Sequence, residues 1–132
     1  MSMNIDSKLN NESNPQRIPT PAQSGITAST SETYWNGGIS AWAIDLVKQG
    51  YYVETLPRTG GLISYGNPNN DQDLSNYKVF IVTEPNSQFT MAEKDAIINF
   101  VKNGGGLYMI ADHDNSDRNG DGWDSPAIWN DL

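Results

Sequence analysis

The stretch VFIVTEPNSQFTMAEKDAIINFVKNGGGLYMIA, residues 79–111, decides the fold of this chain. Its first four residues, 79–82, are all apolar, which predicts a β-strand that is covered on both faces. Thr90 and Glu93 have the spacing of a capping box, in which both side chains satisfy N–H groups at the start of a helix. Residues 107–111 are again apolar. We expect a second strand there, also covered on both faces.

The helix between the two strands is predicted from Ile97, Phe100 and Val101, which share one face at helical spacing. Asn103 and Gly104 end this helix, because glycine readily adopts the left-handed conformation that follows a helix. A strand, a helix and a strand with short connections predict a right-handed crossover between parallel strands. The fold class is therefore α/β, with a small parallel sheet in a three-layer sandwich.

The segments before this unit complete the predicted domain. Residues 18–33 are rich in Pro, Ser and Thr and predict a loop. Apolar side chains recur at helical spacing within residues 34–49, and residues 51–56 are β-branched and aromatic enough for a short strand. Residues 57–76 are rich in Gly, Asn, Pro and Asp, which predicts a long loop.

Both ends of the chain depart from a complete α/β domain. Residues 1–17 are polar and lack the apolar core of a signal peptide, so we expect a disordered leader, and residues 18–132 form a single domain. Ser125 is predicted to cap a last helix, with Pro126 at its first position. A helix of about two turns needs packing partners. We therefore expect a truncated domain that packs on the rest of a longer chain or on a second copy in a homo-oligomer.

Composition excludes several classes of protein. The chain has 132 residues, no Cys and a formal net charge of −8. The absence of Cys rules out disulfides, thiolate metal sites and a cysteine nucleophile. The negative charge argues against nucleic acid or an anionic membrane surface as a partner, and no apolar run approaches the roughly 18–20 residues that span a bilayer. Residues 112–131 hold six Asp and one basic residue, Arg118, so this tail carries −5 of the −8.

Acidic side chains follow both strands of the predicted crossover. Glu84 comes after the first strand, and Asp112, His113 and Asp114 come after the second. Parallel strands place their carboxyl ends at one edge of a sheet, where such folds bind ligands. Carboxylates beside an imidazole bind divalent metals or perform general acid–base catalysis. These four residues are therefore candidate catalytic residues; the alternative is a set of polar strand ends that cap nearby helices.

The acidic tail also contains part of a calcium-loop pattern. Asp117, Asn119 and Asp121 place oxygen-bearing side chains at positions 1, 3 and 5, with glycine at position 6, as in the first half of an EF-hand loop. Position 12 is Ile128 rather than Glu, so the loop is not an EF-hand, and Asp124 or Asp131 can supply a different last ligand. The pattern predicts Ca²⁺ as a cofactor. The alternative is an Asx-rich turn whose side chains bond their own backbone. No glycine spacing of a nucleotide-cofactor site is present.

The segment FVKNGGGL, residues 100–107, resembles the class I glutamine amidotransferase-like superfamily, in a branch of uncharacterised bacterial proteins without amidotransferase activity. PTPAQSGIT (19–27), EPN (84–86) and SDRNGDGWDSP (116–126) resemble segments of the same proteins. The resemblance covers about residues 17–132 and implies a flavodoxin-like fold. It does not imply amidotransferase activity, which needs a nucleophilic Cys and a His-x-Glu pair that this chain lacks.

Three functions remain open. The first is a ligand-binding or structural module in which Ca²⁺ orders the acidic loop; the sequence favours it, because this loop is better specified than any catalytic set. The second is a metal-assisted hydrolase that acts on a small-molecule or carbohydrate-like substrate through Glu84, Asp112, His113 and Asp114. The third is an inactive fragment.

Overall fold

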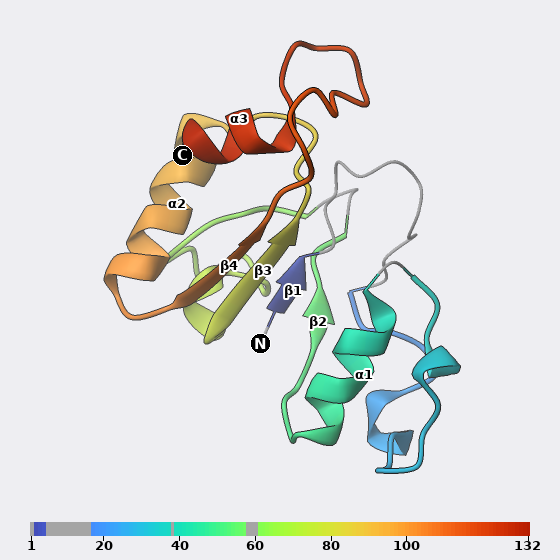
Figure 1. Ribbon diagram of the computed structural model, residues 1–132. Coiled ribbons are helices and arrows are strands. Elements are labelled where there is room, and N and C mark those ends of the chain that lie inside the picture. Colours follow the sequence, from blue (N-terminus) through green and yellow to red (C-terminus); the bar gives the residue numbers. More distant parts are fainter. Residues whose placement is uncertain (1, 5–16, 38, 58–60) are drawn as a thin grey trace.

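The computed structural model describes residues 2–4, 17–37, 39–57 and 61–132 (Figure 1). The chain combines short strands with three α-helices in this part. In order, the elements are β1 (Ser2–Asn4), η1 (Gln23–Gly25), η2 (Glu32–Tyr34), α1 (Ser40–Lys48), β2 (Glu54–Thr55), η3 (Leu74–Asn76), β3 (Val79–Thr83), α2 (Met91–Lys102), β4 (Gly106–Ile110) and α3 (Ser125–Asn130), where η marks a 3₁₀ turn.

The strands form a small parallel sheet in the order β2-β1-β3-β4. Its best-formed part is the pair β3 and β4, in register from Val79 opposite Gly106 to Thr83 opposite Ile110. The helix α2 connects these two strands, and its capping box between Thr90 and Glu93 is formed. The predicted unit of strand, helix and parallel strand is therefore confirmed.

The strand β1 is an addition to the expected fold. The polar composition predicts a disordered leader at residues 2–4, whereas the structure pairs their backbone with both β2 and β3. The remaining residues of the expected leader up to residue 16 lie outside the described part of the chain.

Two apolar clusters lie on opposite faces of β3, because neighbouring side chains of a strand alternate between faces. Phe80 and Val82 pack in a cluster with Ile97 and Phe100 of α2. Ile81 packs in a second cluster with buried residues of α1. Helices thus cover both faces of β3, as the continuous apolar run predicts.

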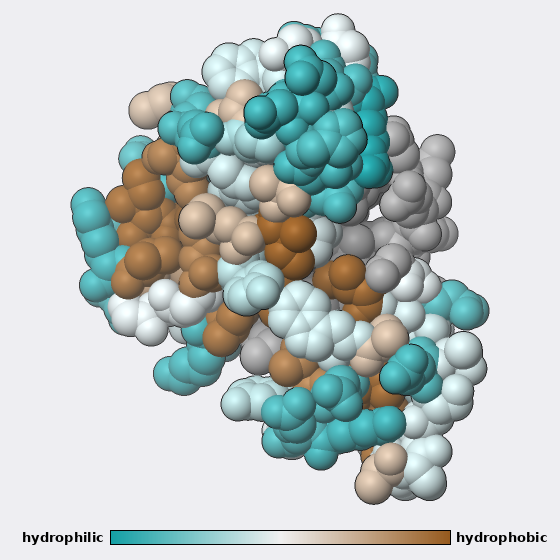
Figure 2. Space-filling model, in the orientation of Figure 1, coloured by the Kyte–Doolittle hydropathy of each residue, from teal (hydrophilic) through white to brown (hydrophobic). Residues whose placement is uncertain are grey.

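The prediction that the second strand is covered on both faces is wrong. Tyr108 and Met109 of β4 are each 54% exposed, and they point to opposite faces. β4 ends the described sheet, and α2 covers it only in part. Figure 2 shows hydrophobic surface in this region, over α2 and β4. Apolar composition alone does not distinguish such an edge strand from a central one.

The last helix, α3, has the packing partners that its short length requires. Ile128 is fully buried in the cluster of α2, and Lys94 of α2 pairs with Asp131 at 2.6 Å. Its cap differs from the prediction, because Asp124 rather than Ser125 accepts the Ala127 N–H. The Ser125 hydroxyl instead accepts the Asp112 N–H at 2.8 Å. None of the helices in the described segments has the length and apolarity to cross a membrane.

Candidate functional site

The ends of β3 and β4 lie side by side, as the parallel arrangement predicts. The Glu84 N–H donates to the Ile110 carbonyl at 2.8 Å, which extends the pairing one residue beyond β3. Glu84 has a positive φ of 44°, so the chain turns sharply there. Asp112 follows β4 two residues after Ile110. The acidic loop then projects beyond this edge of the sheet before α3 begins (Figure 1).

Arg118 connects the two strand-end carboxylates. Its Nη2 donates to Glu84 Oε2 at 3.0 Å and to Asp112 Oδ2 at 3.3 Å. All three side chains are partly buried: Arg118 is 32% exposed, Glu84 is 34% exposed and Asp112 is 28% exposed. One guanidinium therefore bridges two candidate catalytic carboxylates. This role of Arg118 was not predicted from the sequence, although Arg118 is the one basic residue among the six aspartates of the tail.

Asp112 and His113, at the end of β4, shift each other's pKa through their contacts. The His113 N–H donates to Asp112 Oδ1 at 2.8 Å. This bond is the main cause that lowers the pKa of Asp112; burial opposes it, and His113 and Arg118 lower the pKa further. The His113 ring is 77% exposed, with Nδ1 2.7 Å from the Asp114 carbonyl oxygen and Nε2 3.9 Å from Asp112 Oδ1. The contact with the Asp114 carbonyl, and then the charge of Asp112, raises the pKa of His113.

Asp114 lies next to His113 but does not join it through its side chain. The residue is exposed, and its contribution to the imidazole is the backbone carbonyl. The Asp114 carboxylate makes no hydrogen bond with any residue that the structure describes. The structure thus brings Glu84, Asp112 and His113 together around Arg118, whereas the Asp114 carboxylate faces solvent.

Asp117 organises the acidic loop around its carboxylate. One oxygen accepts the N–H groups of Gly120 and Asp121, at 2.8 and 3.2 Å, and the other accepts the Gly122 N–H at 2.7 Å. Gly120 and Gly122 have positive φ values of 72° and 90°, which L side chains rarely adopt. The glycines therefore allow three successive backbone donors to converge on one carboxylate.

Asn119 and Asp121 lie next to each other within this loop. Asn119 Nδ2 donates to Asp121 Oδ2 at 2.9 Å, and Asn119 Oδ1 accepts the Asp121 N–H at 3.3 Å. Asn119 Nδ2 also donates to the carbonyl of Asn86, which lies two residues after Glu84. Asn86 is 4% exposed, and its side-chain nitrogen has no hydrogen-bond partner in the described part of the chain. Asn86 is not among the predicted site residues, since a buried amide in a loop has no local signature.

Asp124 closes the loop at its other end. Its Oδ1 accepts the Ala127 N–H at 2.9 Å and its Oδ2 accepts the Asn115 N–H at 2.7 Å. These two backbone bonds, the one from Ala127 first, lower the pKa of Asp124. Asn115 has a positive φ of 67°, and its N–H is thereby turned toward Asp124. The Asp124 carboxylate thus caps α3 and also joins the two ends of the acidic loop.

Both alternatives for the acidic loop have a geometric basis. The bonds to backbone N–H groups are those of Asx turns. Across the described segments, no group of three or more acidic or histidine side chains gathers closely enough to hold a metal ion. A calcium site also uses amide and backbone carbonyl oxygens, and Asp117, Asn119 and Asp121 occupy one compact turn. Calcium binding therefore stays a prediction.

Comparison of the chain with protein-family models, with curated proteins and with solved structures finds no match.

Proposed function

We propose that this chain is a non-catalytic binding domain with a flavodoxin-like fold, and that its loop 117–124 binds Ca²⁺. The strand order β2-β1-β3-β4 supports the fold, because flavodoxin-like sheets begin with the order 2-1-3-4. The helices on both faces of β3 support it as well. The resemblance of FVKNGGGL to the class I glutamine amidotransferase-like superfamily implies the same fold.

The observation that carries the non-catalytic function is the position of Arg118. A general base or a metal ligand needs an available carboxylate lone pair. Glu84 and Asp112 instead share the guanidinium of Arg118, at 3.0 and 3.3 Å. A metal ion placed between these two carboxylates would have to displace a cation that is already there.

Calcium binding is supported by the charge and shape of the loop. Asp117 and Asp121 contribute two carboxylates, and Asn119 contributes an amide oxygen on the same turn. Ca²⁺ takes six to eight oxygen ligands in flexible geometry, and backbone carbonyls and waters complete its shell. The ion would also offset the repulsion between the aspartates of the loop, of which Arg118 neutralises only a part.

The proposal is tested by thermal unfolding in millimolar Ca²⁺, in Mg²⁺ and in chelator. Because a ligand that binds only the folded state stabilises it by mass action, we expect about 2.7 kcal/mol at a Ca²⁺ concentration 100 times the dissociation constant. Asp117→Asn and Asp121→Asn should each remove most of this gain. Asp45→Asn, which removes the same charge from the exposed side of α1, should leave it intact.

Two results would contradict the proposal. Equal melting temperatures of the wild type in Ca²⁺ and in chelator would exclude the calcium site. The metal-assisted hydrolase is tested with nitrophenyl glycosides and nitrophenyl phosphate as substrates. Turnover that requires a divalent metal, and that His113→Ala abolishes while leaving the metal affinity unchanged, would overturn the non-catalytic function.

A further inference from the structure

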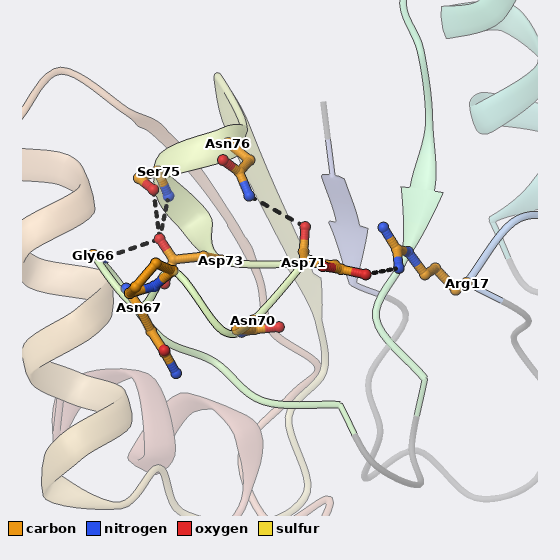
Figure 3. A pocket seen from close by; sticks show the side chains of 9 residues that line it. Arg17, Gly66, Asn67, Asn70, Asp71, Asp73, Ser75 and Asn76 are labelled. Carbon is orange, nitrogen blue, oxygen red and sulfur yellow. Dashed lines mark hydrogen bonds and ion pairs between the residues drawn. The ribbon is translucent and has the colours of Figure 1, made fainter.

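The edge of the described sheet at β2 is covered by another segment of the chain. The side-chain amide of Gln23 accepts the Val53 N–H and donates to the Val53 carbonyl, both at 2.9 Å. The Arg17 carbonyl accepts the Thr55 N–H at 3.0 Å. The Arg17 guanidinium reaches Asp71 at 3.1 Å and so fastens this segment beside β2 (Figure 3). Backbone groups that another strand would need are therefore already bonded at this edge.

The edge at β4 is open within the part of the chain that the structure describes. The N–H of Gly106 and the carbonyl of Ile110 both bond to the backbone on the β3 side. Because successive residues of a strand direct their backbone groups to alternate sides, Leu107 and Met109 direct theirs outward. None of these outward groups bonds to a described residue. β4 also lacks the charged residues and prolines that commonly block an edge strand, so it can accept another strand.

Apolar side chains flank this open edge on both faces of the sheet. Tyr108 points to the face of α1, where its ring centroid lies 5.4 Å from that of Trp42. Met109 lies beside Val82, on the face that α2 covers. Both Tyr108 and Met109 are 54% exposed. A strand added at this edge would therefore bury apolar surface on both faces, in addition to pairing the backbone.

The charges at the two ends of β4 indicate which strand fits there. Lys78 and Lys102 lie at the end where β4 begins, whereas Asp112 and Asp114 follow its last residue. A second copy of β4 that paired in parallel would set the two acidic ends against each other. In antiparallel pairing around a twofold axis, each acidic end instead faces the basic end of the other copy. The edge is therefore complementary to itself in charge as well as in apolar character.

We propose that this chain forms a homodimer in which β4 pairs antiparallel with β4 of a second copy. The register that pairs all five residues of the strand sets Tyr108 opposite Tyr108 of the second copy, and Leu107 opposite Met109. Since Leu107 and Met109 carry the outward groups, each such pair exchanges two backbone hydrogen bonds. The two Tyr108 side chains then pack together on the face of α1. The dimer does not depend on calcium binding at the acidic loop.

The test is sedimentation equilibrium of the full chain at about 5–500 µM, a range that includes the affinities of small interfaces. We expect a reversible equilibrium between monomer and dimer. Tyr108→Lys should weaken the dimer about tenfold or more, because two like charges would meet at the twofold axis. Tyr51→Lys places the same charge on a side chain of similar exposure before β2, and it should leave the affinity unchanged. A wild type that stays monomeric, or a dimer that Tyr108→Lys does not weaken, would overturn the proposal.

A single introduced cysteine tests the register. The chain has no Cys, so such a residue can form a disulfide only with a second copy. Residues opposite each other in a non-hydrogen-bonded antiparallel pair have Cα atoms about 4.5 Å apart, a distance that a disulfide spans. Tyr108→Cys should therefore form a covalent dimer on mild oxidation much faster than Tyr51→Cys, and equal rates would overturn the proposed pairing. The wild-type sedimentation and these two rates decide the proposal even where Tyr108→Lys does not fold.

Discussion

The Arg118 guanidinium donates to the Glu84 carboxylate at 3.0 Å, although the two residues lie 34 positions apart in the sequence. This contact joins the end of β3 to the acidic loop, and Asp112 at the end of β4 shares the same guanidinium. The bridge places a positive charge where the two neighbouring strand ends would otherwise set two carboxylates against each other.

Replacement of Arg118 should make the stability of the protein more dependent on salt. In Arg118→Gln, Glu84 and Asp112 repel each other, and added NaCl screens this repulsion. We expect a modestly lower urea midpoint at low salt, and a larger recovery with NaCl than in the wild type. Lys48→Gln, which removes one exposed positive charge from the last turn of α1, serves as the control. Equal salt dependence of the two variants would contradict the role of the bridge.

Removal of the Asp73 carboxylate should destabilise the fold strongly. Asp73→Ala leaves the donors of Ser64, Gly66, Asn67 and Ser75 without their acceptor. Since hydrogen bonds to a charged group contribute about 1.5–3 kcal/mol, and several are lost together, we expect a loss of about 3 kcal/mol or more in urea unfolding. Asp95→Asn on the exposed side of α2 should change the free energy of unfolding very little.

The same carboxylate predicts the response of stability to acid. Burial alone raises the pKa of Asp73, but the hydrogen bonds from Ser64, Ser75 and the backbone outweigh burial and hold the pKa well below its ordinary 3.8. A group whose pKa is lower in the folded state stabilises that state above its unfolded pKa. The contribution of Asp73 should therefore be complete above about pH 5 and decline as the pH falls below 4. Asp73→Asn should flatten this decline in unfolding measurements that extend from pH 5 to below pH 4.

His113 should titrate above its ordinary pKa of 6.5. The Asp114 carbonyl and the Asp112 charge both favour the imidazolium. Because the folded pKa is raised, the stabilising contribution is present below pH 6.5 and is lost as the pH rises through the folded pKa. NMR titration of the single histidine measures this pKa directly. Asp112→Asn should lower it, whereas Asp131→Asn should not; an unchanged value in Asp112→Asn would show that the carboxylate has no effect.

Two neighbouring glycines after α2 should respond differently to alanine. A Cβ at Gly105 would collide with the ring of Phe100, which is buried at the centre of the core. A Cβ at Gly106 would meet Val79 Cγ2 at 3.4 Å, an ordinary contact. We therefore expect Gly105→Ala to cost about 1–3 kcal/mol, as overpacking does, and Gly106→Ala to cost much less. Similar losses in the two variants, measured by urea unfolding, would contradict this account.

Local patterns predicted the central unit of the fold because its signals act over a few residues. The apolar run before Glu84, the capping box at Thr90 and the glycine after Asn103 each specify an element through neighbouring backbone and side-chain contacts. The parallel pairing of β3 and β4 follows from the short helical connection between them. The proximity of Glu84 and Asp112 follows in turn from that pairing.

Other features depend on contacts between segments and left no local signal. Asp124 caps α3, whereas the Ser125 hydroxyl accepts the Asp112 N–H from the end of β4. The burial of Asp73 within a loop rich in Gly and Asn depends on donors from both sides of it. Tyr108 and Met109 are exposed because β4 ends the described sheet, which their apolar composition does not reveal.

The sequence by itself determined the strand–helix–strand unit and the acidic character of the loop that follows it, since hydrophobic periodicity, capping and charge are written in neighbouring residues. Only the tertiary structure decided how that charge is used. Arg118 reaches back to Glu84 and Asp112, Asp117 and Asp124 bind backbone N–H groups, and Arg17 meets the loop of Asp71 and Asp73. These partners interact because the packing of the chain brings them close in space, and their positions in the sequence do not indicate this.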